Sequence, residues 1–245
     1  AQEMYPDLMI VIIDDALAAG IGPNTVAITF KEQETGFMAG VATALKVQSG
    51  DVGFVGGLEI PAVQKFNWGF QQGVAYANAN LGTSVNMDPS NFVYQGSFAD
   101  LAGGQQLAMA MYDKGVKAIF AAAGGTGVGV INEAKNRRLA GQDVWAVGVD
   151  VDQYSVGDMG NGESCVLTSA MKDVAGVAYD QAIAAANGTF KGGVHLNLGV
   201  AEGRAGIPAS NPNLTPEIEA QVAEVAKLIA DGSIVIQDTA DGLIP

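Results

Sequence analysis

Carboxylate side chains directly follow two apolar runs of this sequence. Residues 144–149 are followed by Asp150, and residues 8–13 are followed by Asp14 and Asp15. Short apolar runs of this kind are typical of buried parallel strands. Open α/β sheets bind ligands just beyond the carboxyl ends of their strands. The pattern therefore predicts a binding cleft whose rim carries carboxylates.

The composition narrows the class of partner. The 245 residues carry a net charge of −14 with only 12 lysines and arginines, which argues against nucleic acid because phosphate binding needs clustered basic residues. Hydrophobic residues make up 49% and charged residues 16%, enough apolar surface for an ordered core. The sequence contains no run of about 18 apolar residues, so it predicts no membrane-spanning helix. The single Cys165 excludes an intrachain disulfide and a multi-cysteine metal site.

Apolar runs alternate with segments of helical periodicity along the whole chain. This alternation predicts βαβ units and parallel sheets. The expected strands are residues 8–13, 25–30, 52–55, 92–95, 117–123, 144–149 and 166–170, and the expected helices are residues 31–48, 61–80, 100–115, 124–138, 171–187 and 216–231.

Several motifs occur in the order in which one protein family carries them. They are FKEQE at residues 30–34, GFMAG at 36–40, VGFVGG at 52–57, Phe66 with Gly69 and Phe70, YQGSFAD at 94–100, AGGTG at 123–127, GVDVDQ at 148–153 and TSAMK at 168–172. On these motifs the chain resembles the basic membrane protein family of solute-binding proteins, of the purine nucleoside receptor A type.

The resemblance implies an α/β, type I periplasmic-binding-protein fold with two Rossmann-like lobes and a hinge. It implies a receptor, not an enzyme, that works outside the cytoplasm, in a periplasm or as a membrane-associated cell-surface lipoprotein. Its partners would be a purine nucleoside of the adenosine, guanosine or inosine class and an ABC permease, with no cofactor, metal or nucleic acid. We expect lobe 1 at residues 1–49 and 166–190, and lobe 2 at residues 50–165 and 191–245.

The chain also departs from the family's pattern. Family members usually carry a long segment before the point that matches Ala1, and the first lobe is therefore expected to be incomplete. A sheet without its first strands exposes unpaired edges. We therefore expect either that this chain is a fragment or trimmed part of a longer one, or that a separate N-terminal fragment is its partner.

Three charged ligand contacts are expected, two from the resemblance and one from its position in the chain. An ionised carboxylate accepts hydrogen bonds from two hydroxyls at once, as the vicinal hydroxyls of a ribose require. Asp150 matches the family's aspartate for this role. Lys172 is expected at a helix start, where a cation gains nothing from the helix dipole. Its placement there favours a role as a ligand contact or as a partner of Asp150. Asp15 matches a further ligand-contacting aspartate, with Asp14 as its rival.

The remaining expected contacts are aromatic and backbone groups. Phe98 lies in a loop where its ring can stack on a purine, or else anchor the following helix. Gly124 and Gly125 would let backbone N–H groups approach a ligand closely. His195, the only histidine, is expected to be structural because no nucleophile pattern accompanies it.

Two other classes of function remain open. Residues 125–129 read G-x-G-x-G and Asp150 ends the next strand, which is similar to a dinucleotide-binding fingerprint, although Val130 stands where the third glycine should be. A nucleoside hydrolase that holds calcium at Asp14 and Asp15 is conceivable. A ligand-sensing domain of a regulator would share the fold.

Overall fold

The larger of two sheets forms the centre of a three-layer body. The computed structural model describes residues 1–245 and contains a seven-stranded sheet with the order β10-β8-β7-β6-β3-β4, in which β5 also pairs with β3. All its pairings are parallel except β10 with β8. The strands are β3 (Ser49–Gly56), β4 (Ser84–Asn86), β5 (Phe92–Tyr94), β6 (Ala118–Ala122), β7 (Trp145–Asp150), β8 (Val166–Lys172) and β10 (Ala205–Gly206). The expectation of parallel sheets is confirmed.

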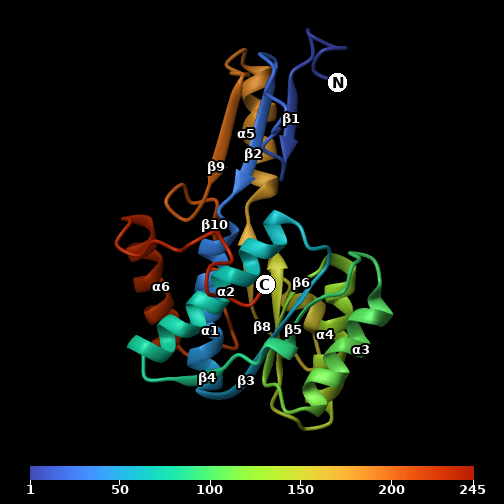
Figure 1. Cartoon of the computed structure of the whole chain (residues 1–245), viewed down its shortest axis with the longest axis vertical. Coiled ribbons are helices and arrows are strands. Elements are labelled where there is room, and N and C mark those ends of the chain that lie inside the picture. Colours follow the sequence, from blue (N-terminus) through green and yellow to red (C-terminus); the bar gives the residue numbers. More distant parts are fainter.

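Helices cover both faces of this sheet (Figure 1). The largest apolar cluster packs α1 (Glu32–Val47), α2 (Pro61–Asn80) and α6 (Pro216–Ala230) on one face. A second cluster packs α3 (Leu101–Asp113) and α4 (Gly124–Leu139) on the other face. Two short 3-10 turns, Pro89–Asn91 and Tyr154–Gly157, complete the connections. None of the helices is both long and apolar enough to cross a membrane.

The smaller sheet lies beyond one end of the large one (Figure 1). Its three parallel strands have the order β1-β2-β9, with β1 (Ile10–Ile13), β2 (Thr25–Phe30) and β9 (Val194–Leu198). Val26, Ile28 and Phe30 face α5 (Val174–Ala186) and form a small apolar core with Val177. No helix covers the opposite face, where His195 and Asn197 are exposed.

The division of the strands between the two sheets does not follow the expected lobe boundaries. β8 pairs with β7 in the large sheet, and α1 packs on that sheet. β9 pairs with β2 in the small sheet. The reason for β8 is that it is buried without interruption from Val166 to Ala170 and therefore needs layers on both faces. The chain consequently crosses between the sheets three times, at Lys31, at Asp173 and between Gly199 and Arg204.

Glycines set the distance between α1 and α2. A Cβ built at Gly73 would lie 2.1 Å from the carbonyl oxygen of Phe37, and one at Gly40 would lie 2.3 Å from that of Phe70. Any side chain here would push the two helices apart. The GFMAG motif of α1 is thereby explained as a helix-packing surface, which lets α1 lie close against α2.

Candidate functional site

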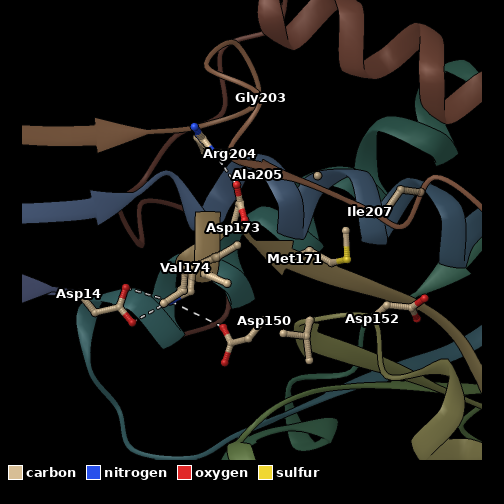
Figure 2. Close-up of a pocket in the computed structure, with 14 residues that line it drawn as sticks. Asp14, Asp150, Asp152, Met171, Asp173, Val174, Gly203, Arg204, Ala205 and Ile207 are labelled. Carbon is tan, nitrogen blue, oxygen red and sulfur yellow. Dashed lines mark hydrogen bonds and ion pairs between the residues drawn. The ribbon is translucent and has the colours of Figure 1, made fainter. Parts of the chain in front are cut away.

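A buried ammonium group lies where the two sheets meet. Lys172 is the last residue of β8, and its side chain is only 4% exposed. Its Nζ lies 3.0 and 2.9 Å from the two carboxylate oxygens of Asp14, which directly follows β1. It also lies 3.6 Å from Asp150 Oδ1 at the end of β7 (Figure 2). Glu32 Oε1, at the start of α1, lies 3.6 Å from the same Nζ. One lysine thus contacts carboxylates from both sheets.

The two aspartates share an uncommon backbone conformation. Asp14 and Asp150 both have φ of 66°. Residues other than glycine rarely adopt this left-handed region, and aspartate is among the few that tolerate it. Backbone outliers of this kind concentrate at ligand sites because the surrounding structure must hold them in place. Here each one ends a strand and brings its carboxylate to Lys172.

Burial and mutual attraction shift the ionisation of this cluster. Burial raises the pKa of Glu32 to about 7. Burial likewise raises the pKa of Asp150, and repulsion from Asp14 adds to the effect. Burial alone would lower the pKa of Lys172, yet attraction by Asp150, Glu32 and Asp14 outweighs it and raises that pKa. Lys172 therefore stays charged at neutral pH, whereas Glu32 is close to its midpoint.

An apolar hollow of about 300 Å³ lies on one side of the cluster. It opens at the ends of β6 and β7, and the strand order reverses between β3 and β6, the position where open α/β sheets bind ligands. Its lining residues are Asp14, Ile60, Ala62, Val63, Phe66, Phe98, Ala122, Gly124, Val149, Asp150 and Lys172.

A larger hollow of about 700 Å³ lies on the other side, beside α5 and β10 (Figure 2). It is more polar, since four aspartates line it. Its lining residues are Asp14, Asp150, Val151, Asp152, Met171, Lys172, Asp173, Val174, Ala175, Gly203, Arg204, Ala205, Gly206 and Ile207. Both hollows share Asp14, Asp150 and Lys172, so the ion cluster stands between them.

The structure brings some of the expected site residues together. Asp150 and Lys172 are in contact, although Lys172 ends a strand and does not begin a helix as expected. Asp15 does not join them; its Oδ1 accepts a hydrogen bond from the Leu17 N–H at 2.7 Å. Asp14, which we considered as its rival, occupies the cluster instead.

Phe98 and the two glycines lie close to one another. The Phe98 ring is 38% exposed and lies so close to Gly57 that a Cβ there would be 2.2 Å from the ring. Gly124 begins α4 with φ of 55° and lines the apolar hollow, while Gly125 faces the Phe98 carbonyl. The ligand-binding roles of all the expected site residues stay predictions.

Sequence reasoning missed the place of Glu32. Its position at a helix start favours a simple interaction with the helix dipole, but its side chain is buried under Lys172. The signal that could have found it is its place just after β2, because Asp14 and Asp150 also stand at strand ends. His195 lies on the small sheet, with Nε2 2.8 Å from Thr29 Oγ1 and no other site group beside it.

Comparison with protein families gives one match over almost the whole chain. Residues 2–239 match the family described as ABC transporter substrate-binding protein PnrA-like. The chain is 34% identical to a CD4+ T-cell-stimulating antigen of Listeria monocytogenes, covering 95% of this chain and 64% of that protein. It is 31% identical to the ABC transporter nucleoside-binding protein BmpA of Lactococcus lactis, covering 96% and 66%. The chain thus spans about two thirds or less of the length of these relatives.

Solved structures give the fold. A solute-binding protein of an ABC transporter system from Aeropyrum pernix K1 superposes with a TM-score of 0.82 at 24% identity, covering 98% of this chain and 74% of that one. One from Conexibacter woesei gives 0.69 at 22% identity, covering 97% and 74%. The expected type I periplasmic-binding-protein fold is confirmed.

Replacing Lys172 with methionine should test the ion cluster. The variant keeps most of the side-chain volume but leaves Glu32, Asp14 and Asp150 without their cation, which should lower the free energy of unfolding by about 3 kcal/mol at pH 8. The pKa values of Glu32 and Asp150 are raised above those of the unfolded chain. As the pH falls, the folded variant therefore takes up protons at a higher pH than the unfolded variant does. The loss in the free energy of unfolding should accordingly be smaller at pH 5.5 than at pH 8.

Urea unfolding at both pH values measures this difference. Lys227→Met is the matched control, because its ion pair with Glu224 is exposed on both sides and should change stability by less than about 0.5 kcal/mol. Equal losses for the two variants would contradict the central role of the cluster.

Proposed function

Because the chain belongs to the family of PnrA-like ABC transporter substrate-binding proteins, we propose that it captures a purine nucleoside between its two sheets. The family consists of binding proteins and not of enzymes. The observation that carries the proposal is the Asp14–Lys172–Asp150 cluster, which joins the ends of β1, β7 and β8 beside an apolar hollow. A nucleoside has the matching division into a hydroxylated sugar and a flat, largely apolar base.

The sugar is assigned to the ion cluster. Asp14 and Asp150 each have a carboxylate that is about half exposed, at 42% and 51%, so both can accept hydrogen bonds from an incoming ligand while Lys172 keeps them oriented. Vicinal hydroxyls suit such acceptors, and hydrogen bonds to a charged group are roughly twice as strong as neutral ones. Asp15 is retained as an outer contact, since it directly follows Asp14 in the chain and is exposed.

The base is assigned to the apolar hollow. Phe98 offers a partly exposed ring at its rim, and Phe66 closes its floor. Gly124 begins α4 without a side chain and lines the hollow, so a base edge can approach the backbone at this helix start, with Gly125 as the next residue of the same turn. This arrangement favours a purine, whose larger face gains more from stacking.

Ligand capture would be accompanied by closure of the two lobes. We propose lobes redrawn by sheet: the small lobe contains β1, β2, α5 and β9, and the large lobe contains the remaining elements. The three crossings at Lys31, Asp173 and residues 199–204 form the hinge. The Asp14–Lys172 ion pair joins the lobes, so a ligand that binds both groups gains affinity for the closed form.

The partner of the closed form is an ABC permease. Substrate-binding proteins of ABC importers work outside the cytoplasm, and we place this chain there, in a periplasm or on the cell surface as a membrane-associated lipoprotein. The match to a family of ABC transporter substrate-binding proteins supports this placement.

A further N-terminal segment is proposed to complete the small lobe. β1 is an edge strand with no partner on its outer side. Leu8, Met9 and Val11 are exposed there, and one face of the sheet has no helix on it. An open edge with apolar side chains favours pairing with another chain segment. The relatives, of whose length this chain spans about two thirds or less, support such a segment, on the same or on a separate chain.

Asp150→Ala should weaken the binding of every nucleoside at least tenfold, or about 1.4 kcal/mol, because the sugar loses its charged acceptor. Isothermal titration with adenosine, guanosine and inosine measures this, and cells that carry the variant should import nucleosides more slowly. Asp143→Ala is the control, since that carboxylate is 85% exposed and pairs with Arg138 away from the cleft. An unchanged dissociation constant would refute the assignment of the sugar.

Phe98→Ala should weaken the binding of purine nucleosides by roughly 1–3 kcal/mol, the range for stacking of one base on an aromatic ring. The melting temperature without ligand should change little because the ring is already partly exposed. Titration of adenosine beside a melting curve separates the two effects. A large fall in melting temperature with unchanged affinity would show that the ring only anchors the following helix.

Native mass spectrometry of the protein purified from its source cells should reveal the segment that completes the small lobe. We expect a species heavier than the 25.0 kDa chain, and heavier again by one nucleoside. A 25.0 kDa species that binds nucleoside with full affinity would remove the need for the segment.

A further inference from the structure

Glu32 is a buried carboxyl group that the proposed recognition of the ligand leaves unused. It is the first residue of α1, and its side chain is 3% exposed. The only cation within ion-pair distance is Lys172, whose Nζ lies 3.6 Å from Glu32 Oε1. Glu32 therefore lies on the inner side of the ammonium group, while Asp14 and Asp150 meet the same group from the open cleft.

The surroundings of Lys172 leave little freedom to this ammonium. The rings of Phe30 and Phe66 lie 5.5 and 5.6 Å from Nζ, close enough for cation–π attraction. With the carboxylates of Asp14 and Asp150 ahead and that of Glu32 behind, the position of Nζ is fixed from every side. Glu32 supplies the contact that prevents Lys172 from moving fully toward the cleft.

The charges of the cluster do not balance. Three carboxylates face one ammonium, and the next cation that acts on Glu32 is Lys65 on α2. The charged groups that face Glu32 are thus Lys172 from β8, Lys65 from α2 and Asp14 beyond β1, with Asp150 of β7 behind Lys172. In the open cleft, water offsets the excess negative charge. A neutral ligand that closes the cleft removes this water and brings no cation.

We propose that Glu32 is the positioning residue of the cleft, which holds Lys172 in place and takes up a proton when a neutral ligand closes the two lobes. This inference rests on the proposed function, because it needs an uncharged, hydroxylated ligand. The side chains of Asp14 and Asp150 are about half exposed and serve as acceptors for that ligand, whereas Glu32 is the most buried of the three carboxyl groups and is therefore the one that we assign to be neutralised. The proton comes from solvent, and protonated Glu32 keeps its second oxygen as an acceptor for Lys172.

The direction of the resulting pH dependence follows from linkage. In the free protein the pKa of Glu32 is about 7, raised by burial. Closure removes more water and raises this pKa further in the bound state. Below pH 7 Glu32 is protonated in both states, and its ionisation leaves the affinity unchanged. Above pH 7 binding must take up a proton, so the dissociation constant rises by up to about tenfold per pH unit until the pH passes the bound-state pKa.

Isothermal titration of the protein, as its gene encodes it, measures the proton directly. Inosine, adenosine and guanosine are titrated at pH 7.5 in phosphate and in Tris buffer, whose ionisation heats differ, and the difference in binding heat gives the number of protons taken up. We expect a net uptake of up to one proton per ligand in the unaltered protein. Glu32→Gln, which mimics the protonated group at the same volume, should abolish the uptake and keep the dissociation constant level from pH 6 to 8.5.

Glu224→Gln on the outer side of α6 is the matched control and should retain both the uptake and the pH dependence. If Glu32 has a purely structural role, Glu32→Gln should instead weaken binding equally at every pH and leave the proton uptake in place. That result would overturn the inference. Nucleoside binding without proton uptake in the unaltered protein also overturns it, even if Glu32→Gln does not fold, and leaves the proposed function standing. Absence of binding by all three nucleosides overturns the proposed function and this inference together.

Discussion

The structure depends on one buried ammonium group that is shared by two sheets. Lys172 belongs to the large sheet, and its shortest contacts are with Asp14 of the small sheet, at 2.9 and 3.0 Å. A buried charge without a partner is strongly unfavourable, so Lys172 requires that the carboxylates stay nearby. This requirement explains why Asp14 and Asp150 both keep a left-handed backbone. It also means that the relative position of the sheets and the ionisation of the cluster cannot vary independently.

The first turn of α1 connects the cluster to the hinge. Glu32 contacts Lys172, next to the second crossing. Glu34 accepts a hydrogen bond from the Val200 N–H at 2.7 Å and so contacts the third crossing, and the Thr35 hydroxyl donates to the Gly206 carbonyl in β10, just after that crossing. The first crossing is Lys31 itself, whose N–H donates to the Leu198 carbonyl at 2.9 Å. A single turn therefore contacts all three crossings, which gives the FKEQE motif a structural explanation.

The sequence predicts the sheets well and the contacts across them less well. An apolar run such as the one before Asp150 is a reliable sign of a buried strand, because a strand that is buried on both faces needs apolar residues at successive positions. β9 contains His195 and Asn197 on its exposed face and gives a weaker pattern, and its pairing with β2 is set by contacts 166 to 168 residues apart in sequence. The choice between Asp14 and Asp15 depends on one backbone torsion angle, which no local pattern encodes. The sequence places Lys172 at a helix start, whereas in the structure it ends β8, and α5 begins two residues later with Asp173 as its N-cap.

The ion cluster separates two hollows of unlike character, and this separation constrains any ligand. The hollow beside Phe66 and Phe98 is apolar, whereas the hollow beside Asp152 and Asp173 is acidic, and its one arginine, Arg204, is already paired with Asp173 and Asp180. An anionic group next to the cluster would meet uncompensated carboxylates in both the cluster and the acidic hollow. These charges therefore favour a ligand that places hydrogen-bond donors on the cluster, an apolar face on one side, and a neutral or positively charged end on the other. Electrostatic repulsion thus narrows the choice of ligand at the same three residues that hold the two sheets together.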